Sequence, residues 1–171
     1  MITDKLKQIR LLLLDVDGVL TTGDIIYNDR GEETKVFNAK DGLGLRLLMK
    51  AGIRVGIVTG RRSEALRHRC KNLQIDLVFD GIREKAGTLS EIEKQSSVSS
   101  AHIAFVGDDL PDLPIMRKCG VAIAVADAHE LVKEAADMVT HAKGGRGAVR
   151  ETAEAILKAQ DAWDRLIHSL F

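Results

Sequence analysis

Two carboxylates stand two residues apart where a strongly apolar run ends. The stretch reads LLLLDVDGVLTTGD from Leu11 to Asp24, and only Val16 separates Asp15 from Asp17. The leucines predict a buried strand, and side chains at i and i+2 of a strand point the same way, so both carboxylates can face one pocket. An aspartate ionised at neutral pH can attack phosphorus without a base, while a neighbouring carboxyl protonates the leaving alkoxide and later accepts a proton from water. The pair therefore suits hydrolysis of a phosphate ester through an acyl phosphate.

Further polar groups stand at the ends of other apolar runs. Thr59 and Asp108 each lie at the end of such a run, and Lys85 opens the helical segment after a third. In an open α/β sheet, ligands bind outside the carboxyl ends of the strands, so we expect these groups to meet Asp15 and Asp17 at one edge. Converging carboxylates repel one another unless a cation lies among them, and hard oxygen ligands indicate Mg²⁺. Thr59 and Lys85 would hold the transferring oxygens.

The elements that must position these groups alternate along the chain. Continuous runs rich in Val, Ile and Leu predict buried strands at about 9–16, 53–60, 76–81, 102–109 and 121–128. Amphipathic segments predict helices at about 41–51, 63–73, 84–95, 110–118 and 128–136. This alternation predicts an α/β fold with a doubly wound parallel sheet, formed by residues 1–171 as a single domain.

Two segments interrupt the alternation. Residues 23–38, GDIIYNDRGEETKVFN, place two β-rich arms around a turn at 28–31, which predicts a hairpin that projects from the sheet. From Gly144 the chain reads GGRGAVRE, which predicts a flexible basic tail followed by a helix that runs to Leu166, within a tail region of about 144–171.

Composition excludes several classes of protein. Lys and Arg together number 25, as do Asp and Glu, so no net charge attracts nucleic acid or an anionic membrane. No stretch approaches the ~20 apolar residues of a membrane helix, and the charged N-terminus lacks a signal-peptide core. Cys70 and Cys119 fit no disulfide framework or CxxC site, and the five histidines lack metal-ligand spacing. We expect a cytoplasmic protein without nucleic-acid or membrane partners.

The motifs together resemble a known family. DVDGVLT, VTGR, Lys85 and GDDLPD resemble, in order and spacing, the four motifs of the haloacid dehalogenase superfamily of phosphotransferases. The longer stretches FNAKDGLGLRLL, VTGRRSEALRHRC, FVGDDLPDLPIMRKCGVAIAVADAH and KGGRGAVRE resemble the branch of this superfamily that dephosphorylates 3-deoxy-D-manno-octulosonate 8-phosphate, an acidic sugar ester of lipopolysaccharide synthesis. The resemblance implies a Rossmann-like core, a Mg²⁺ cofactor and a small sugar phosphate as substrate.

The resemblance also implies roles for individual residues. Asp15 would be the nucleophile and a Mg²⁺ ligand, and Asp17 would be the acid/base and would ligate Mg²⁺ through its backbone carbonyl. Asp108 would be the third ligand, with Asp109 and Asp112 in support. Contacts with the phosphoryl group and the sugar would fall on Asp17, Asn38, Ala39, Lys40, Asp41, Gly42, Arg46, Thr59, Arg61, Arg69 and Lys85.

The spacing of the motifs leaves no room for a large cap domain. Only 44 positions separate Asp15 from Thr59 and 26 separate Thr59 from Lys85. Phosphoryl transfer benefits from the exclusion of bulk water, so the hairpin and the basic tail are the segments available to cover the site. The resemblance implies a homotetramer joined through its hairpins, in which Arg146 or Arg150 could reach a substrate carboxylate across the interface.

Several alternatives stay open at the level of sequence. Asp109 and Asp112 suit helix capping as well as catalytic support, and Arg46 and Arg69 suit surface salt bridges. The same chemistry would serve a nonulosonate 9-phosphate. In another class, a signalling receiver module also gathers acids, a Thr and a Lys around Mg²⁺, although its phospho-acceptor lies on the third strand and not the first. A third alternative is a catalytically silent scaffold that assembles through the hairpin.

Overall fold

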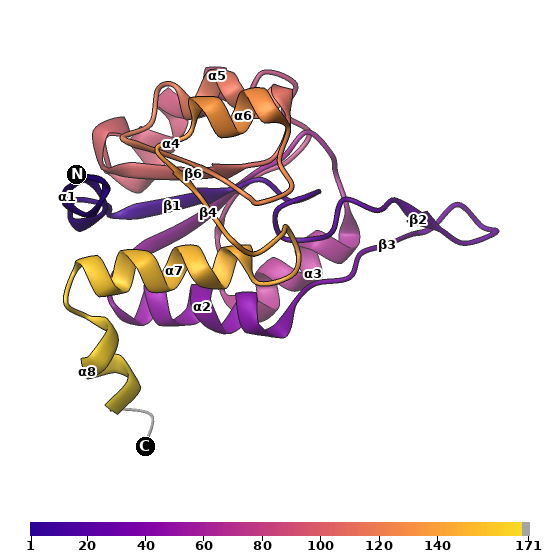
Figure 1. The fold of residues 1–171 in the computed structure, drawn as a ribbon. Helices are drawn as coiled ribbons and strands as arrows, with labels where there is room; N and C mark the ends of the chain where they lie inside the picture. The colour runs from indigo at the N-terminus through magenta and orange to yellow at the C-terminus, as the bar shows by residue number, and fades with distance from the viewer. Residues whose placement is uncertain (169–171) are drawn as a thin grey trace.

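The computed structural model describes residues 1–168 and has a six-stranded parallel sheet at its centre (Figure 1). Every strand pair in this sheet is parallel, and the spatial order is β5-β4-β1-β6-β7-β8. The strands are β1 (Leu11–Leu14), β4 (Arg54–Val58), β5 (Leu77–Phe79), β6 (Ile103–Gly107), β7 (Val121–Ala124) and β8 (Met138–Val139). The predicted α/β class and doubly wound parallel sheet are confirmed.

Helices cover both faces of the sheet. Figure 1 shows α2 (Ala39–Lys50), α3 (Glu64–Leu73) and α7 (Ala148–Ala159) on one side, and α4 (Leu89–Ser96), α5 (Leu113–Met116) and α6 (Glu130–Ala135) on the other. The short helices α1 (Ile2–Lys7) and α8 (Trp163–His168) and the 3₁₀ turns η1 (Lys85–Thr88), η2 (Ser100–His102) and η3 (Leu110–Asp112) complete the set. Among residues 1–168, no helix is long and apolar enough to cross a membrane.

The strand order reverses its winding at β1. From β1 the chain forms β4 and β5 on one side, then returns to the other side of β1 to form β6. Leu14 pairs with Ile57 of β4 and with Val106 of β6, and the four leucines of β1 are completely buried. In doubly wound sheets, ligands bind where the winding reverses, outside the carboxyl ends of the strands. Asp15, the first residue after β1, therefore lies at the expected ligand site.

The predicted hairpin projects from the sheet, as Figure 1 shows. Its arms pair antiparallel as β2 (Ile26–Tyr27) and β3 (Glu33–Thr34). The turn between them is closed by the N–H of Gly31, which donates to the carbonyl of Asn28 at 2.9 Å. No large cap domain covers the sheet in the described part of the chain.

Some predicted boundaries differ from the observed ones. The segment predicted as a helix over 110–118 divides into η3 and α5, with Pro111 and Pro114 in the first turns of the two pieces. The helix predicted to run to Leu166 divides into α7, which ends at Ala159, and α8, and Asp161 between them adopts a left-handed conformation with a φ of 54°. The predicted tail region extends to residue 171, and its last three residues lie outside the described residues. The sequence pattern indicated neither α1 nor β8, which are both short.

The Gly-rich segment at 144–147 packs against the loop that follows β1. The N–H of Gly145 donates to the carbonyl of Val19 at 2.8 Å, and the N–H of Gly144 donates to the carboxylate of Asp127 at 2.9 Å. A Cβ atom at Gly144 would lie 1.6 Å from the carbonyl oxygen of Gly18, so only glycine permits this approach. The Gly-rich segment is thus in direct backbone contact with the loop that follows β1.

Candidate active site

The loop after β1 turns sharply around Gly18. The N–H groups of Leu20 and Thr21 both donate to the carbonyl of Val16, at 2.9 and 3.0 Å. Gly18 has a φ of +91°, and a Cβ atom there would lie 2.0 Å from a carboxylate oxygen of Asp108. Glycine at this position therefore allows both the turn and the close approach of Asp108 from the end of β6.

Three carboxylates converge beside this turn. One oxygen from each of Asp15, Asp108 and Asp112 lies within 4.8 Å of the other two. Asp15 and Asp112 are buried, and the Oδ1 atom of Asp108 is buried without a hydrogen-bond partner. A buried carboxylate oxygen that lacks a partner is unfavourable, and clustered hard oxygens are the ligands that Mg²⁺ prefers. The residues present at this position therefore fit a hard divalent cation.

The raised pKa values of Asp15 and Asp108 also indicate that the cluster suits a cation. Burial, followed by repulsion from Asp15, Asp112 and Asp109, raises the pKa of Asp108 to about 8. Burial and repulsion from Asp112 raise the pKa of Asp15 to about 6, although Lys85 opposes the rise. Without a cation, Asp108 therefore keeps at neutral pH a proton that a free carboxyl group would have lost.

Lys85 connects two members of the cluster. Its Nζ atom lies 2.7 Å from Asp15 Oδ1 and 2.6 Å from Asp112 Oδ1, and its side chain is buried. Burial alone would lower the pKa of Lys85, but the charges of Asp15 and Asp112 outweigh it and raise the pKa. The other oxygen of Asp112 accepts the N–H of Asp108 at 3.0 Å. Asp112 therefore supports both Lys85 and the Asp108 loop, whereas Asp109 caps η3 by accepting the N–H of Leu110 at 2.8 Å.

Thr59 lies at the end of β4, on the other side of β1 from β6 and Asp108. It directly follows β4, is buried, and its N–H donates to the carbonyl of Phe79 at 2.9 Å. Its Oγ1 atom accepts the N–H of Arg61 at 3.4 Å. The ends of β1, β4 and β6 thus carry Asp15, Thr59 and Asp108, as the sequence predicts.

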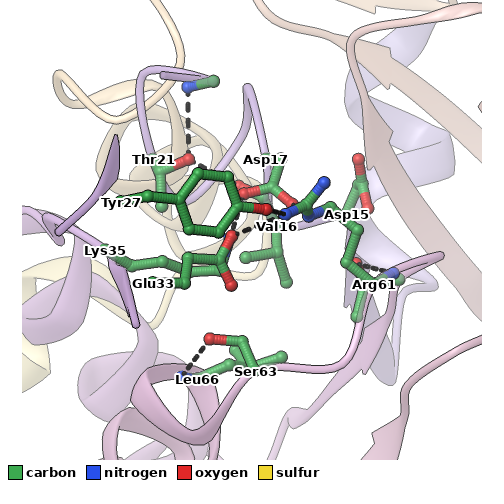
Figure 2. A network of polar contacts seen from close by, with 12 residues as sticks. Asp15, Val16, Asp17, Thr21, Tyr27, Glu33, Lys35, Arg61, Ser63 and Leu66 are labelled. Atoms are coloured by element: carbon green, nitrogen blue, oxygen red, sulfur yellow. Dashed lines mark hydrogen bonds and ion pairs between the residues drawn. The ribbon is translucent and has the colours of Figure 1, made fainter. Parts of the chain in front are cut away.

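The carboxylate of Asp17 belongs to a different set of contacts, at the base of the hairpin (Figure 2). Its Oδ1 atom accepts a hydrogen bond from Lys35, and Arg61 Nε lies 3.6 Å from its Oδ2 atom. Arg61 Nη2 also donates to Glu33 Oε1 and to the hydroxyl of Tyr27, each at 2.9 Å. Asp17 therefore contributes no side-chain oxygen to the cluster of three carboxylates.

Lys35, Glu33 and Tyr27 were not among the residues predicted for the site. Charged side chains on an exposed hairpin are normally solvated, so the sequence did not indicate a role in the site for Glu33 or Lys35. The available signal was the i, i+2 spacing of Glu33 and Lys35, which puts both on one side of the hairpin arm. Burial tends to raise the pKa of Glu33, but hydrogen bonds from Lys35 and Arg61 outweigh it and hold the pKa below its usual value.

The predicted sugar contacts around the start of α2 divide into two groups. Asn38 caps the helix, because its side chain accepts the N–H of Lys40 at 2.8 Å, and its carbonyl accepts a hydrogen bond from Arg69 at 3.2 Å. Ala39 and Lys40 are exposed beside it. A Cβ atom at Gly42 would lie 2.3 Å from the Arg69 guanidinium, so this pair is in close contact.

Asp41 and Arg46 make other contacts. The carboxylate of Asp41 is buried and accepts the N–H groups of Gly147 at 3.3 Å and Arg150 at 2.8 Å. Burial raises the pKa of Asp41, although these two donors oppose the rise. The Asp41 side chain thus anchors the start of α7. Arg46 donates to the carbonyl of Asn72 at 3.2 Å and does not join the carboxylates.

A cavity of about 330 Å³ lies between the base of the hairpin and the Gly-rich segment. Asn38 and Arg146 both line it. The Arg150 side chain is directed elsewhere, because its Nε atom donates to Glu154 at 2.8 Å and its guanidinium lies 5.5 Å from the Trp163 ring. Of the two arginines considered from the sequence, Arg146 is the one beside this cavity.

Comparisons with known proteins identify related sequences and structures. A family model for haloacid dehalogenase-like hydrolases matches residues 82–151. The 3-deoxy-D-manno-octulosonate 8-phosphate phosphatase of Salmonella typhi is 45% identical over 94% of this chain and 85% of its own length, and that of Escherichia coli strain K12 is 44% identical over the same shares.

Solved structures give the same result. The phosphatase of Moraxella catarrhalis, in complex with magnesium, phosphate and the sugar acid, has a TM-score of 0.96 and 42% identity, covering 99% of this chain and 98% of that one. The cobalt-bound enzyme of Haemophilus influenzae has a TM-score of 0.90 and 44% identity, covering 92% of each chain.

Proposed function

The chain belongs to the 3-deoxy-D-manno-octulosonate 8-phosphate phosphatases, a family of haloacid dehalogenase-like hydrolases, and we propose that it hydrolyses this ester to the free sugar acid and phosphate. The observation that carries the proposal is the buried contact of Lys85 with Asp15 beside the unpartnered oxygen of Asp108. The arrangement joins an anionic nucleophile, a fixed positive charge and a cation site at the end of β1. The reaction supplies an acidic sugar for lipopolysaccharide synthesis.

Asp15 is the nucleophile in this proposal. Its carboxylate oxygen attacks phosphorus, and the bond between phosphorus and the sugar oxygen breaks. Asp17 gives its proton to the leaving alkoxide and is left ionised. Water then attacks the phosphorus of the acyl phosphate and loses a proton to Asp17. The bond between phosphorus and the Asp15 oxygen breaks, so phosphate is released and the Asp15 carboxylate is regenerated. Proton and bond counts balance over the two steps, and both carboxyl groups return to their starting forms.

Asp15, Asp108 and the backbone carbonyl of Asp17 would hold Mg²⁺. The unpartnered Asp108 oxygen supports this assignment, and the oxygens of Asp112 are already engaged by Lys85 and the N–H of Asp108. When bound, Mg²⁺ supplies positive charge that offsets the repulsion between the nucleophile and the anionic phosphoryl group. Lys85 and Thr59 would contact the phosphoryl oxygens.

The sugar would bind at the base of the hairpin. Arg61 and Arg69 supply positive charge there, and Arg146 lines the adjacent cavity, which supports recognition of the sugar carboxylate. Predicted contacts with Asn38, Ala39, Lys40 and Gly42 would come from the start of α2, whereas Arg46 would need to leave its contact with the Asn72 carbonyl. Asp41 would act by fixing the segment around Gly147.

We also propose that the protein is a cytoplasmic homotetramer. Four apolar side chains of the projecting hairpin are exposed, namely Ile25, Ile26, Tyr27 and Val36. Exposed apolar clusters of this kind are typical of interaction sites, which supports assembly through the hairpins. Cys70 and Cys119 are both unpaired, which supports a reducing compartment.

The test is phosphate release from 3-deoxy-D-manno-octulosonate 8-phosphate, a nonulosonate 9-phosphate and hexose phosphates, with Mg²⁺ and then with EDTA. Mg²⁺-dependent preference for the octulosonate ester is the expected result. Equal release from every ester would keep the chemistry and remove the specificity. No release together with a long-lived phospho-aspartate would favour a receiver module, and no phosphorylation at all would favour a silent scaffold.

A further inference from the structure

We propose that Lys35 is a positioning residue that holds the Asp17 carboxylate for proton transfer to the leaving group. The inference rests on the proposed function, because it concerns a step of that reaction. It makes the hairpin part of the catalytic arrangement in addition to a cover for the site. Neither Lys35 nor its partner Glu33 was among the residues expected to take part.

The burial of Lys35 is the first observation. Its side chain is only 2% exposed, although it belongs to a projecting hairpin whose apolar residues face solvent. Lysine is almost never fully buried unless its charge is paired. The pairing here is with Asp17 Oδ1 and with Glu33 Oε1, which lies 3.2 Å away. The hairpin therefore places a fixed cation against the proposed acid/base.

The two cationic side chains beside Asp17 differ in solvent exposure. Arg61 is 43% exposed and faces Asp17 Oδ2 at 3.6 Å, beyond ordinary hydrogen-bond distance. Lys35 is enclosed and contacts Oδ1 directly. Lys35 can therefore hold one oxygen of Asp17 throughout the reaction, while Arg61 stays available to an anionic substrate and Oδ2 stays available for the proton.

The contact with Glu33 also restrains the Lys35 side chain. Glu33 accepts from both Lys35 and Arg61, and Tyr27, opposite Glu33 in the hairpin, accepts from Arg61 at 2.9 Å (Figure 2). Paired residues of the two hairpin arms thus face the loop after β1. Such a network restricts the rotamers of its members, as positioning of a catalytic group requires.

A series of small artificial esters separates positioning from other roles. p-Nitrophenyl, phenyl and benzyl phosphate have similar shapes, lack the sugar, and release leaving groups that depend increasingly on a proton donor. In K35M, the loss of kcat/KM should grow along this series, by a factor on the order of 10 or more from the first ester to the last. D17N should show the same trend, K35R should recover part of the loss, and K35M should add little in a D17N background.

The controls exclude a general defect. K94M places the same substitution at exposed Lys94 of α4 and should leave all three rates unchanged. Thermal unfolding of each variant reports folding, and K35Q replaces K35M if the latter is destabilised. An equal loss on all three esters would overturn the proposal and leave Lys35 as a hairpin anchor. A loss confined to the octulosonate ester would overturn it in favour of a sugar contact. If the wild-type protein cleaves the artificial esters and not the octulosonate ester, the proposed substrate fails while the Lys35 test stands.

Discussion

The ammonium of Lys85 lies 2.7 Å from the carboxylate of Asp15, with both side chains removed from solvent. Burial disfavours an ionised nucleophile, and this contact opposes that effect. Lys85 comes from the turn after β5 and Asp15 from the end of β1, two elements that the sheet order separates by β4. The positive charge beside the proposed nucleophile thus comes from an element two strands away in the sheet.

Replacement of the nucleophile is the most direct prediction. D15N should abolish turnover, with a loss of several orders of magnitude, because the amide cannot form the acyl phosphate. The fold should persist, since asparagine is close in volume to aspartate. Phosphate release, with thermal unfolding in EDTA as the folding control, checks both statements. Appreciable residual activity would contradict the assignment of Asp15.

Removal of the Lys85 charge should affect both activity and stability. K85M leaves Asp15 and Asp112 buried without their shared cation, which should lower the free energy of unfolding by about 3 kcal/mol. Turnover should be lost, and K94M is the matched control. Urea denaturation compares the variants. An unchanged free energy of unfolding in K85M would show that the buried contacts do not stabilise the protein.

The sequence predicted the strand ends of the site well. Continuous aliphatic runs predicted the central strands, and the rule that ligands bind at their carboxyl ends placed Asp15, Thr59 and Asp108 together. Both conclusions depend on local pattern and general topology, which one sequence supplies. The short strand β8 and helix α1 carry too few residues to produce such a pattern.

Long-range contacts could not be predicted from local sequence patterns. The Asp41 carboxylate binds the N–H groups of Gly147 and Arg150, more than a hundred residues away, so its structural use is invisible locally. From the sequence alone, Lys35 is expected to be a solvated charge, and its contact with Asp17 exists only in the folded hairpin. Both side chains acquire their surroundings only from tertiary packing.

The metal-free protein should lose stability as pH rises. The pKa of Asp108 is raised to about 8 and that of Asp15 to about 6, above the ordinary value near 4. Between about pH 4 and pH 8 these two carboxyl groups therefore bind more protons in the folded state than in the unfolded state, so their contribution to the free energy of unfolding falls across this interval. Thermal unfolding in EDTA at a series of pH values should show the decline, and Mg²⁺ should raise Tm most at the alkaline end.

The variant D108N checks the origin of this effect. It removes the titrating group with the unpartnered oxygen, so the decline of Tm with pH should flatten and most of the Mg²⁺ response should disappear. A Mg²⁺-induced rise in Tm as large as that of the wild type would mean that the cation binds elsewhere.

Gly18 offers a test with a close internal control. G18A would place a Cβ atom 2.0 Å from the Asp108 carboxylate at a φ of +91°, whereas Gly52 has a φ of +86° and open space at that position. Both substitutions should destabilise the fold by about 1 kcal/mol through the left-handed backbone. Only G18A should also weaken Mg²⁺ binding and lower kcat. Equal activity in G18A and G52A would mean that Asp108 can move without consequence.

Arg146 and Arg150 separate sugar recognition from helix packing. R146A should raise KM for the octulosonate ester by roughly 10-fold or more, because a charge-assisted hydrogen bond in the cavity contributes about 1.5 to 3 kcal/mol. It should leave KM for p-nitrophenyl phosphate nearly unchanged, since that ester has no carboxylate. R150A should alter neither KM, because its guanidinium contacts Glu154 and Trp163. Steady-state kinetics on both esters provide the measurement. A rise in both KM values for R146A would indicate that the Gly-rich segment supports the site only through its backbone, and a specific rise for R150A would assign the sugar carboxylate to the start of α7.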